Sequence, residues 1–379
     1  MKRLTDLLEG RREPTTLLGK TALQLLGGAG HLYGMAMQLR AALYRHHLLP
    51  AYRAPCPVLS VGNLSAGGTG KTPMVLWLAQ QLRHKRLTIV SRGYGTPGNA
   101  KGITVVADPD GVRLAPPLAA DEATLLARNL PGVALLTGAD RSRLIRFAVE
   151  QYASELILMD DGFQHLRVQR DLDLLLMDGA HPLGNGFLLP GGILRERPQA
   201  LHRCDAILLT RCGEEETFAR ARKMVARIAP DKPILRADHQ PRVWLRLGSN
   251  TPLDLDALAD KPVLAFCGIA RPDSFARLLA KTHTQTTGWQ IFPDHFCYTR
   301  ASGAALVRQA QASGAEALVC TEKDAVKMDP AWLHSAGTEF PLFFLQMAIH
   351  FPEKPLWLLQ KLQEIAGINS PDAAPRPPA

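Results

Sequence analysis

The chain has 379 residues, enough for about two domains and for a large hydrophobic core that needs no disulfide bonds to hold it. Hydrophobic residues make up 46% of the sequence, as in ordinary globular α/β enzymes. The six cysteines form no C-x-x-C pair, which argues against a structural zinc site and predicts reduced thiols in the cytosol. The formal net charge is +9, and no acidic residue occurs between Glu13 and Asp108. This one-sided charge indicates an anionic partner: phosphate, nucleic acid or an anionic membrane surface.

The N-terminal segment, residues 1–50, is predicted to be membrane-associated and helical. The range Leu17–Leu49 is apolar with basic flanks, and Thr21–Leu39 carries no formal charge. That length is compatible with a membrane span, but polar residues and four glycines within it argue against one. A helix lying in the membrane surface, with Arg40 and Arg45 at the lipid head groups, fits the pattern better. The alternative is a helix packed on the soluble core.

A glycine-rich loop follows the first predicted strand. Val58–Val61 is a short apolar run typical of a buried strand, and a helical pattern covers Met74–Leu82. Strand, glycine loop, Lys-Thr and helix in this order predict a phosphate-binding P-loop. The predicted phosphate-binding residues are Ser65, Ala66, Gly67, Gly68, Thr69, Gly70, Lys71 and Thr72.

The chemistry of phosphate binding explains the composition of this loop. Glycines allow consecutive backbone N–H groups to turn toward phosphate oxygens, and the helix N-terminus adds positive partial charge. Lys71 can reach the outer phosphates, and the Thr72 hydroxyl can ligate a magnesium ion. Ser65 stands where the usual consensus has glycine. By itself the loop predicts a bound nucleoside triphosphate, and the alternative is a glycine-rich turn without a ligand.

Apolar strands alternate with helical stretches after Cys56. The expected strands are Cys56–Val61, Leu87–Ser91, Val133–Thr137, Leu156–Met159, Leu172–Met177 and Ala206–Thr210. The expected helices are Met74–Arg83, Asp121–Arg128, Arg141–Tyr152 and Glu214–Ile228. Such alternation predicts a mostly parallel sheet with helices on both faces. Ile103–Val106 and Gly111–Leu114 are expected to form a hairpin at its edge.

A second, smaller α/β domain is predicted to follow. Pro233–Asp238 and Pro241–Leu247 have the composition of strands, and we expect them to form a ribbon that links the two domains. Further strands and helices are expected at Val263–Cys267, Asp273–Lys281, Trp289–Phe292, Ala301–Ser313 and Ala317–Thr321. The predicted fold is thus a P-loop NTPase-like sheet sandwiched by helices, with a ribbon-joined smaller α/β domain and an N-terminal membrane-surface helix. The expected boundaries are 51–232 for the P-loop core domain, 233–365 for the smaller domain and 366–379 for a disordered tail.

Two carboxylates end the predicted strand Leu156–Met159. Asp160 and Asp161 follow it as in a Walker B element, and the carboxyl ends of parallel strands lie beside a P-loop. Together with Thr72 they are the predicted ligands of Mg²⁺. The pattern leaves open which of the two aspartates binds the metal.

Three other loops follow apolar runs and are candidate walls of the site: Ser91–Gly95, Gly162–His165 and Leu183–Glu196. They are rich in glycine and polar side chains, and Arg92 in the first of them suits phosphate. Taken alone, each is also compatible with an ordinary turn.

An acidic residue and a histidine stand at the ends of predicted elements. Asp294-His295 leaves an apolar strand, and Asp121 begins a helix. A lone histidine is more often structural than functional. An acidic residue in the first helical turn ordinarily complements the helix dipole.

Six motifs follow one another in this chain: Gly62–Pro73, Ser91–Gly95, Asp160–His165, Gly184–Gly186 with Leu194–Glu196, Asp294-His295 and Thr321–Lys327. Together they resemble the tetraacyldisaccharide 4′-kinase family, the lipid A 4′-kinases of Gram-negative bacteria. The resemblance covers about residues 20–350. That family's loop also lacks the glycine that Ser65 replaces.

The resemblance implies ATP- and Mg²⁺-dependent transfer of phosphate to the 4′-hydroxyl of a tetraacylated disaccharide 1-phosphate, which gives lipid IVA in lipid A biosynthesis. It implies Asp121 as the base that accepts the hydroxyl proton, and His295 as its partner when the smaller domain closes. Candidate residues of the acceptor side are Asn63, Arg92, Gly93, Tyr94, His165, Arg195 and Glu196.

The resemblance also implies where the protein works and with what. It implies a peripheral or monotopic enzyme at the cytoplasmic face of the bacterial inner membrane. Its partners are then the membrane-embedded acylated disaccharide phosphate and the anionic membrane surface. No nucleic acid and no obligate protein partner is expected.

Two alternative functions are compatible with parts of the sequence. A P-loop GTPase or nucleotide-driven metallochaperone would share the loop, but a GTPase carries an N-K-x-D guanine reader, and no asparagine here is followed by lysine. A membrane or nucleic-acid binder without enzymatic activity would use the basic N-terminal region. Such a protein would have no use for Lys71, Asp121 and His295 together.

Overall fold

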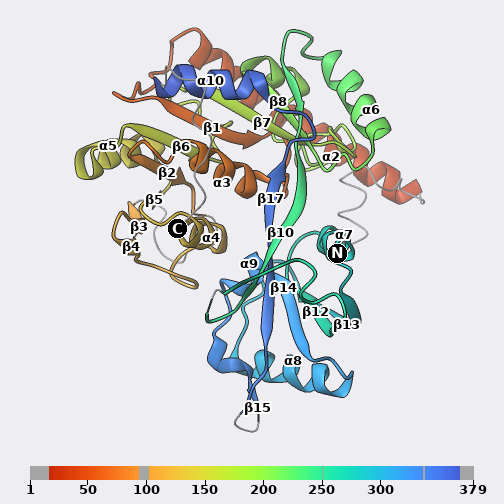
Figure 1. Cartoon of the computed structure of the whole chain (residues 1–379). Coiled ribbons are helices and arrows are strands. Elements are labelled where there is room, and N and C mark those ends of the chain that lie inside the picture. The colour runs from red at the N-terminus through yellow and green to blue at the C-terminus, as the bar shows by residue number, and fades with distance from the viewer. Residues whose placement is uncertain (1–16, 94–101, 250, 336–337, 368–379) are drawn as a thin grey trace.

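Two domains lie one above the other in a computed structural model of the chain, which describes residues 17–93, 102–249, 251–335 and 338–367 (Figure 1). Two long strands, β10 (Asp238–Arg246) and β17 (Leu342–His350), run between them. The N-terminal residues before 17 and the expected tail after 367 lie outside the described residues.

The larger domain is built on a nine-stranded sheet in the order β4-β3-β5-β2-β6-β1-β7-β8-β9. Its strands are β1 (Val58–Asn63), β2 (Leu87–Ser91), β3 (Thr104–Asp108), β4 (Gly111–Val112), β5 (Ala134–Thr137), β6 (Leu156–Asp160), β7 (Leu172–Asp178), β8 (Ala206–Thr210) and β9 (Ile234–Arg236). The strands from β5 to β9 in this order pair in parallel, and β3 and β4 add an antiparallel hairpin at the edge. The mostly parallel sheet and its edge hairpin are therefore confirmed.

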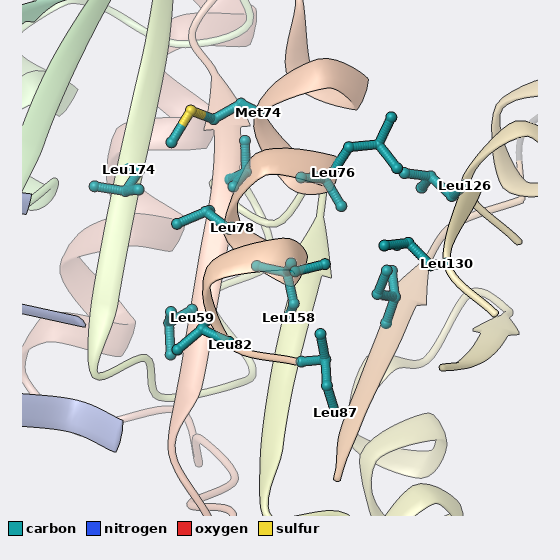
Figure 2. Close-up of a cluster of buried hydrophobic side chains, with 14 of the residues drawn as sticks. Leu59, Met74, Leu76, Leu78, Leu82, Leu87, Leu126, Leu130, Leu158 and Leu174 are labelled. Atoms are coloured by element: carbon teal, nitrogen blue, oxygen red, sulfur yellow. The ribbon is translucent and has the colours of Figure 1, made fainter. Parts of the chain in front are cut away.

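Helices cover both faces of this sheet, because its inner strands are apolar along their whole length. The helices are α3 (Lys71–Gln81), α4 (Asp121–Asn129), α5 (Arg141–Tyr152) and α6 (Glu215–Ala226), with a 3₁₀ helix at Pro198–Arg203. Alternate residues of one strand serve the two faces: Leu174 packs in the cluster with α3, and Leu175 packs in the cluster with α6. Figure 2 shows Leu78 of α3 and Leu82, which caps its C-terminus, beside the strand leucines.

The smaller domain has a six-stranded sheet in the order β11-β10-β17-β14-β12-β13. Its further strands are β11 (Pro252–Leu253), β12 (Pro262–Cys267), β13 (Gln285–Ile291) and β14 (Ala317–Thr321), and β15 (His334–Ser335) pairs with β16 (Thr338–Glu339). Its helices are α7 (Pro272–Ala280), α8 (Arg300–Ala312) and the short α9 (Glu322–Ala325), with a 3₁₀ helix at Pro330–Leu333. Helices α7 and α8 pack on opposite faces of the sheet.

The strands of the linking ribbon differ from those expected. The expected partners, Pro233–Asp238 and Pro241–Leu247, do not pair with each other. Instead β9 extends the large sheet beside β8, and β10 pairs antiparallel with β17 from Asp238↔His350 to Arg246↔Phe343. The reason is that the apolar run of β17 offers a nine-residue partner that lies about a hundred residues further along the chain.

The C-terminal helix α10 (Leu356–Ala366) was expected in the smaller domain but packs on the larger one. Its residues Leu358 and Leu362 belong to the same core cluster as α3 and α4. The chain therefore returns along β17 to the domain from which it came, as Figure 1 shows.

The N-terminal helix α2 (Leu17–Arg45) has one face packed and another exposed. Its glycines face the loop after β7: a methyl group at Gly30 would lie 2.9 Å from the Leu188 carbonyl oxygen, and one at Gly34 would collide with the Leu188 side chain. These glycines let helix and loop approach closely. Within the described ranges, no helix combines the length and apolar character needed to cross a membrane.

Leu358→Ala should lower the free energy of unfolding of the larger domain by about 2–5 kcal/mol, because it opens a cavity in the core under α10. Leu356 lies in the same helix but is 59% exposed, so Leu356→Ala should cost no more than about 0.5 kcal/mol. Urea titration followed by circular dichroism measures both. Equal losses in the two variants would show that α10 does not belong to this core.

Candidate active site

The glycine loop has the geometry of an anion-binding P-loop. It runs from the end of β1 to α3, with Gly67 and Gly68 exposed and Gly70 at a φ of 87°. Helix α3 begins at Lys71 without a side-chain cap, so its first N–H groups are available to an anion. Pro73 falls in the first turn, where a missing N–H costs little.

Buried contacts hold the loop in place from beneath. Asn63, predicted on the acceptor side, is fully buried, and its Nδ2 donates to the Gly67 carbonyl at 3.1 Å. The Ala66 N–H donates to the Ile193 carbonyl, and the Arg195 N–H donates to the Leu64 carbonyl at 2.8 Å. The segment around Arg195 therefore lies directly against the P-loop. Ser65 and Thr69 are likewise buried, which makes them supports of the loop.

Lys71 and Arg195 converge on one carboxylate. Lys71 Nζ lies 3.3 Å from Asp161 Oδ1, and Arg195 Nη1 lies 3.0 Å from both oxygens of Asp161. Burial would raise the pKa of Asp161, but the two cations outweigh it and lower that pKa. Arg195 Nη1 also reaches Gln164 Oε1 at 3.3 Å. The P-loop lysine, the Walker B position and the Leu183–Glu196 loop thus form one charged cluster.

Asp160 is in the opposite situation, because it is buried and forms no ion pair with any residue that the structure describes. Burial, followed by the charge of Glu122, raises the pKa of Asp160 to about 7. Ser91 Oγ donates to Oδ2 at 3.2 Å, whereas Oδ1 has no hydrogen-bond partner among the described residues. A buried carboxylate oxygen without a partner, at the end of the strand that pairs with β1 before the P-loop, fits a divalent cation.

The donor set also fits magnesium in particular. Within the described ranges, no three His, Cys, Asp or Glu side chains form a ready-made metal cluster. Magnesium is commonly held by one or two carboxylates together with substrate phosphates and water. Asp160 and Thr72 meet that description better than Asp161, whose oxygens are occupied by Lys71 and Arg195.

Asp121 and His295 are in contact across the domain boundary. Asp121 is the first residue of α4 in the larger domain, and His295 follows β13 in the smaller one. His295 Nδ1 lies 3.1 Å from Asp121 Oδ2. Because Glu122 raises the pKa of Asp160, the first turn of α4 is also within electrostatic reach of the end of β6.

Three residues of the site have left-handed backbone conformations, which are costly for residues other than glycine. The φ angles are 55° at Asp161, 57° at Arg211 and 57° at His295. Each stands at the end of a strand or just beyond one. The backbone at these positions is held by its surroundings, as is common at functional sites.

The remaining predicted residues occupy different surroundings. Arg92 is exposed and Gly93 has a φ of 70°, both just after β2, whereas Tyr94 lies outside the described residues. Burial, with nearby Arg141, lowers the pKa of His165 to about 4, so this imidazole is neutral. Glu196 is buried, and Arg203 holds both of its oxygens at 2.7 and 2.9 Å.

A further group behind the P-loop was missed in the sequence. Arg211 donates to the Gly68 carbonyl and pairs with Asp178 Oδ2 at 3.1 Å. Arg271, from the smaller domain, pairs with the same Asp178 oxygen. Asp178 ends β7 and Arg211 follows β8, so the rule that found Asp160 at a parallel strand's carboxyl end would also have found both. The partner Arg271 has no such local signal.

The fold and this site define a P-loop phosphotransferase of two domains, with the nucleotide loop at the carboxyl edge of a parallel sheet. The comparisons with known proteins are more specific. The family model for tetraacyldisaccharide-1-P 4′-kinase matches residues 22–364. The chain therefore belongs to the tetraacyldisaccharide 4′-kinase family.

Relatives and a solved structure agree with this assignment. Proteins named tetraacyldisaccharide 4′-kinase from Anaeromyxobacter dehalogenans strain 2CP-C and Geobacter metallireducens are 42% and 39% identical to this chain. The matches cover 80% and 90% of this chain, and 80% and 98% of those proteins. A crystal structure of LpxK from Aquifex aeolicus in complex with ATP is 28% identical, with a TM-score of 0.73 over 91% of this chain and 99% of that one. The kinase prediction is confirmed over the GTPase and the non-enzymatic alternatives.

The two neighbouring aspartates should affect stability in opposite directions. Asp160 has a raised pKa in the folded chain. Its contribution to the free energy of unfolding is therefore fully present below about pH 4, where the carboxyl group is protonated, and is lost as the pH rises through about 7. Without nucleotide or magnesium, Asp160→Asn should therefore stabilise the chain above pH 7, by on the order of 4 kcal/mol. Asp161 has a lowered pKa, so Asp161→Asn should destabilise the chain at neutral pH. Urea titrations between pH 4 and 8 test both signs, and a pH-independent effect of Asp160→Asn would contradict the assignment.

Proposed function

We propose that this chain transfers the terminal phosphoryl group of ATP to the 4′-hydroxyl of a tetraacylated disaccharide 1-phosphate, with Asp121 as the general base. The family fixes the kind of reaction, and the 3.1 Å contact between Asp121 Oδ2 and His295 Nδ1 is the observation that supports the roles of the residues. In this structure a carboxylate from one domain and an imidazole from the other meet at the domain boundary.

The phosphate side of the reaction belongs to the P-loop. Backbone N–H groups of the glycine loop and of the start of α3 bind the phosphates, and Lys71 neutralises charge on the outer ones. Lys71 exchanges its contact with Asp161 for a phosphate oxygen, while Arg195 remains to balance that carboxylate. ATP is chosen over other nucleotides because the related Aquifex aeolicus protein was solved in complex with ATP.

Asp160 and Thr72 are the residues that would hold magnesium. The ion, when bound, supplies neutralisation of the charge that develops on the transferring phosphoryl group. Asp160 is proposed as the ligand because its buried Oδ1 has no other partner in the described part of the chain. Asp161 serves instead to orient Lys71 and Arg195.

The acceptor side needs a base, because a sugar hydroxyl is a poor nucleophile. Asp121 accepts the proton of the 4′-hydroxyl, and His295 orients the carboxylate through Oδ2. Chemistry then waits for domain closure, which also excludes water from the phosphoryl group. Arg92 and His165 remain proposed contacts of the disaccharide phosphate, whereas Glu196 supports the loop through Arg203.

The membrane surface is the proposed partner of α2. Leu25, Leu32 and Leu39 are 73%, 66% and 62% exposed, and their spacing of seven residues places them on one stripe. The packed glycines lie on the opposite face. An exposed apolar stripe with arginines near the helix end is typical of a helix lying in an anionic membrane surface. We place the enzyme at the cytoplasmic face of the inner membrane, where ATP is available.

Asp121→Asn should lower the turnover number by about 10²–10⁴-fold, with ATP binding retained, because it removes the base and leaves the P-loop intact. The assay combines labelled ATP with a tetraacylated disaccharide 1-phosphate and identifies the 4′-phosphorylated product. Asp110→Asn, an exposed carboxylate on the β3–β4 hairpin, is the control and should keep the wild-type rate. A wild-type rate in Asp121→Asn would remove Asp121 from the mechanism.

Replacing the stripe of α2 should release the chain from membranes. The triple variant Leu25→Asp, Leu32→Asp and Leu39→Asp should reduce co-sedimentation with anionic vesicles at least about tenfold, since each buried leucine contributes roughly 1.5–3 kcal/mol. A triple variant of exposed residues elsewhere, Leu118→Asp, Met224→Asp and Leu356→Asp, is matched for charge and should sediment like wild type. If the α2 variant still sediments fully, the membrane contact lies on another surface.

A further inference from the structure

The segment Thr321–Lys327 is a motif that the proposed roles leave unused. It ends β14 and forms the short helix α9, and α9 lies against α4 of the larger domain (Figure 1). Two of its side chains reach across: Glu322 accepts from Asn129 Nδ2 at 2.7 Å, and Lys323 Nζ lies 3.4 Å from Glu122 Oε1. The segment therefore contacts α4 both at its last residue and in its first turn, where Asp121 lies.

Asp324 is the fixed centre of this segment. It is fully buried and accepts hydrogen bonds from the Gly268 N–H at 3.1 Å, Tyr298 Oη at 3.0 Å and Thr321 Oγ1 at 2.6 Å. Burial and the charge of Asp324 raise the pKa of Tyr298, so the phenol stays protonated and remains a donor. These three hydrogen bonds fix the orientation of the Asp324 carboxylate. Because a buried carboxylate is costly without a compensating charge, it also requires a nearby cation.

Lys327 supplies that cation and also reaches Asp121. Its side chain is 5% exposed, and its Nζ lies 3.1 Å from Asp324 Oδ1 and 5.1 Å from the centre of the Tyr298 ring. The same Nζ lies 3.8 Å from Asp121 Oδ2. Two carboxylates and an aromatic face thus hold one buried ammonium group at the domain boundary.

Both groups that the smaller domain brings to Asp121 approach the same oxygen. His295 Nδ1 lies 3.1 Å from Oδ2 and Lys327 Nζ lies 3.8 Å from it. Among the described residues, the hydrogen bond from the smaller domain goes to Oδ2, and none is made to Oδ1. The arrangement leaves one carboxylate oxygen held by the smaller domain and the other open to a ligand.

We propose that Lys327 is a positioning residue for Asp121. Its ammonium group holds Oδ2 of Asp121 and so turns Oδ1 of the same carboxylate toward the acceptor hydroxyl. The proposal rests on the proposed function, in which Asp121 is the base. The proposal assigns a role to the Thr321–Lys327 segment. Asp324 fixes the position of Lys327 within the smaller domain, and domain closure brings Lys327 and His295 together to Asp121. A lysine that served only to neutralise Asp324 would have no need to stand at the boundary.

The test compares Lys327→Gln in two backgrounds. Glutamine can still donate to Asp324 but carries no charge, so in the wild-type background we expect kcat to fall about 10- to 100-fold through misplacement of the base. The KM for ATP should stay within about twofold, because the P-loop is untouched. In the Asp121→Asn background, Lys327→Gln should cause no further loss. A purely structural lysine would instead cause the same fold loss in both backgrounds, which would overturn the proposal, as would a wild-type kcat in Lys327→Gln.

The double variant Asp324→Asn with Lys327→Gln is the control for loss of activity through misfolding, because it leaves neither charge of this buried pair without its partner. It should melt cooperatively and show the same loss of kcat as Lys327→Gln; a wild-type kcat in it also overturns the proposal. The outcomes separate the two levels of inference. If Asp121→Asn alone keeps the wild-type rate, the proposed function of Asp121 fails and this proposal with it. If Asp121→Asn is slow but Lys327→Gln is not, only the role of Lys327 is lost.

Discussion

Parallel pairing of β1 with β6 and β7 is the constraint on which the site depends. The register that sets Val61 opposite Asp160 and Asn63 opposite Leu176 brings three strand ends to one edge of one sheet. The P-loop, the Walker B carboxylates and Asp178 follow from that single alignment. Everything supplied by the smaller domain, including His295, Lys327 and Arg271, approaches this edge from outside. In the proposed mechanism the larger domain carries the nucleotide loop, and the smaller one completes the site.

Charge at this edge is arranged so that some carboxylates are paired and one is not. Asp161 and Asp178 each have two basic partners, and each has a lowered pKa despite burial. Asp160 forms no ion pair with a described residue and has a raised pKa. An unpaired buried carboxylate costs stability, and such a cost is commonly retained where a ligand will remove it. The difference between Asp160 and Asp161 therefore separates the proposed metal ligand from the residue that orients the cations, a choice that the Asp-Asp pattern alone leaves open.

Much of the fold could be predicted from local patterns, and the failures share one cause. Strands such as β2 and β8 and the helix α5 lie where apolar runs and helical periodicity placed them. The pairing of β10 with β17 and the return of α10 to the larger domain depend on contacts between segments a hundred residues or more apart. A local sequence pattern does not predict which distant strand a given strand will pair with. The site shows the same division: Lys71 and His295 stand in motifs, whereas the contact of Arg271 with Asp178 and that of Lys327 with Asp121 appear only when the domains meet.

The most direct test of this account is a single-turnover cycle with saturating ATP on Asp121→Asn, His295→Ala and the double variant. If the two residues act as one unit across the domain boundary, the double variant loses no more rate than the slower single variant. If the two losses multiply, the carboxylate and the imidazole act independently, and the contact between the domains is not the catalytic pair.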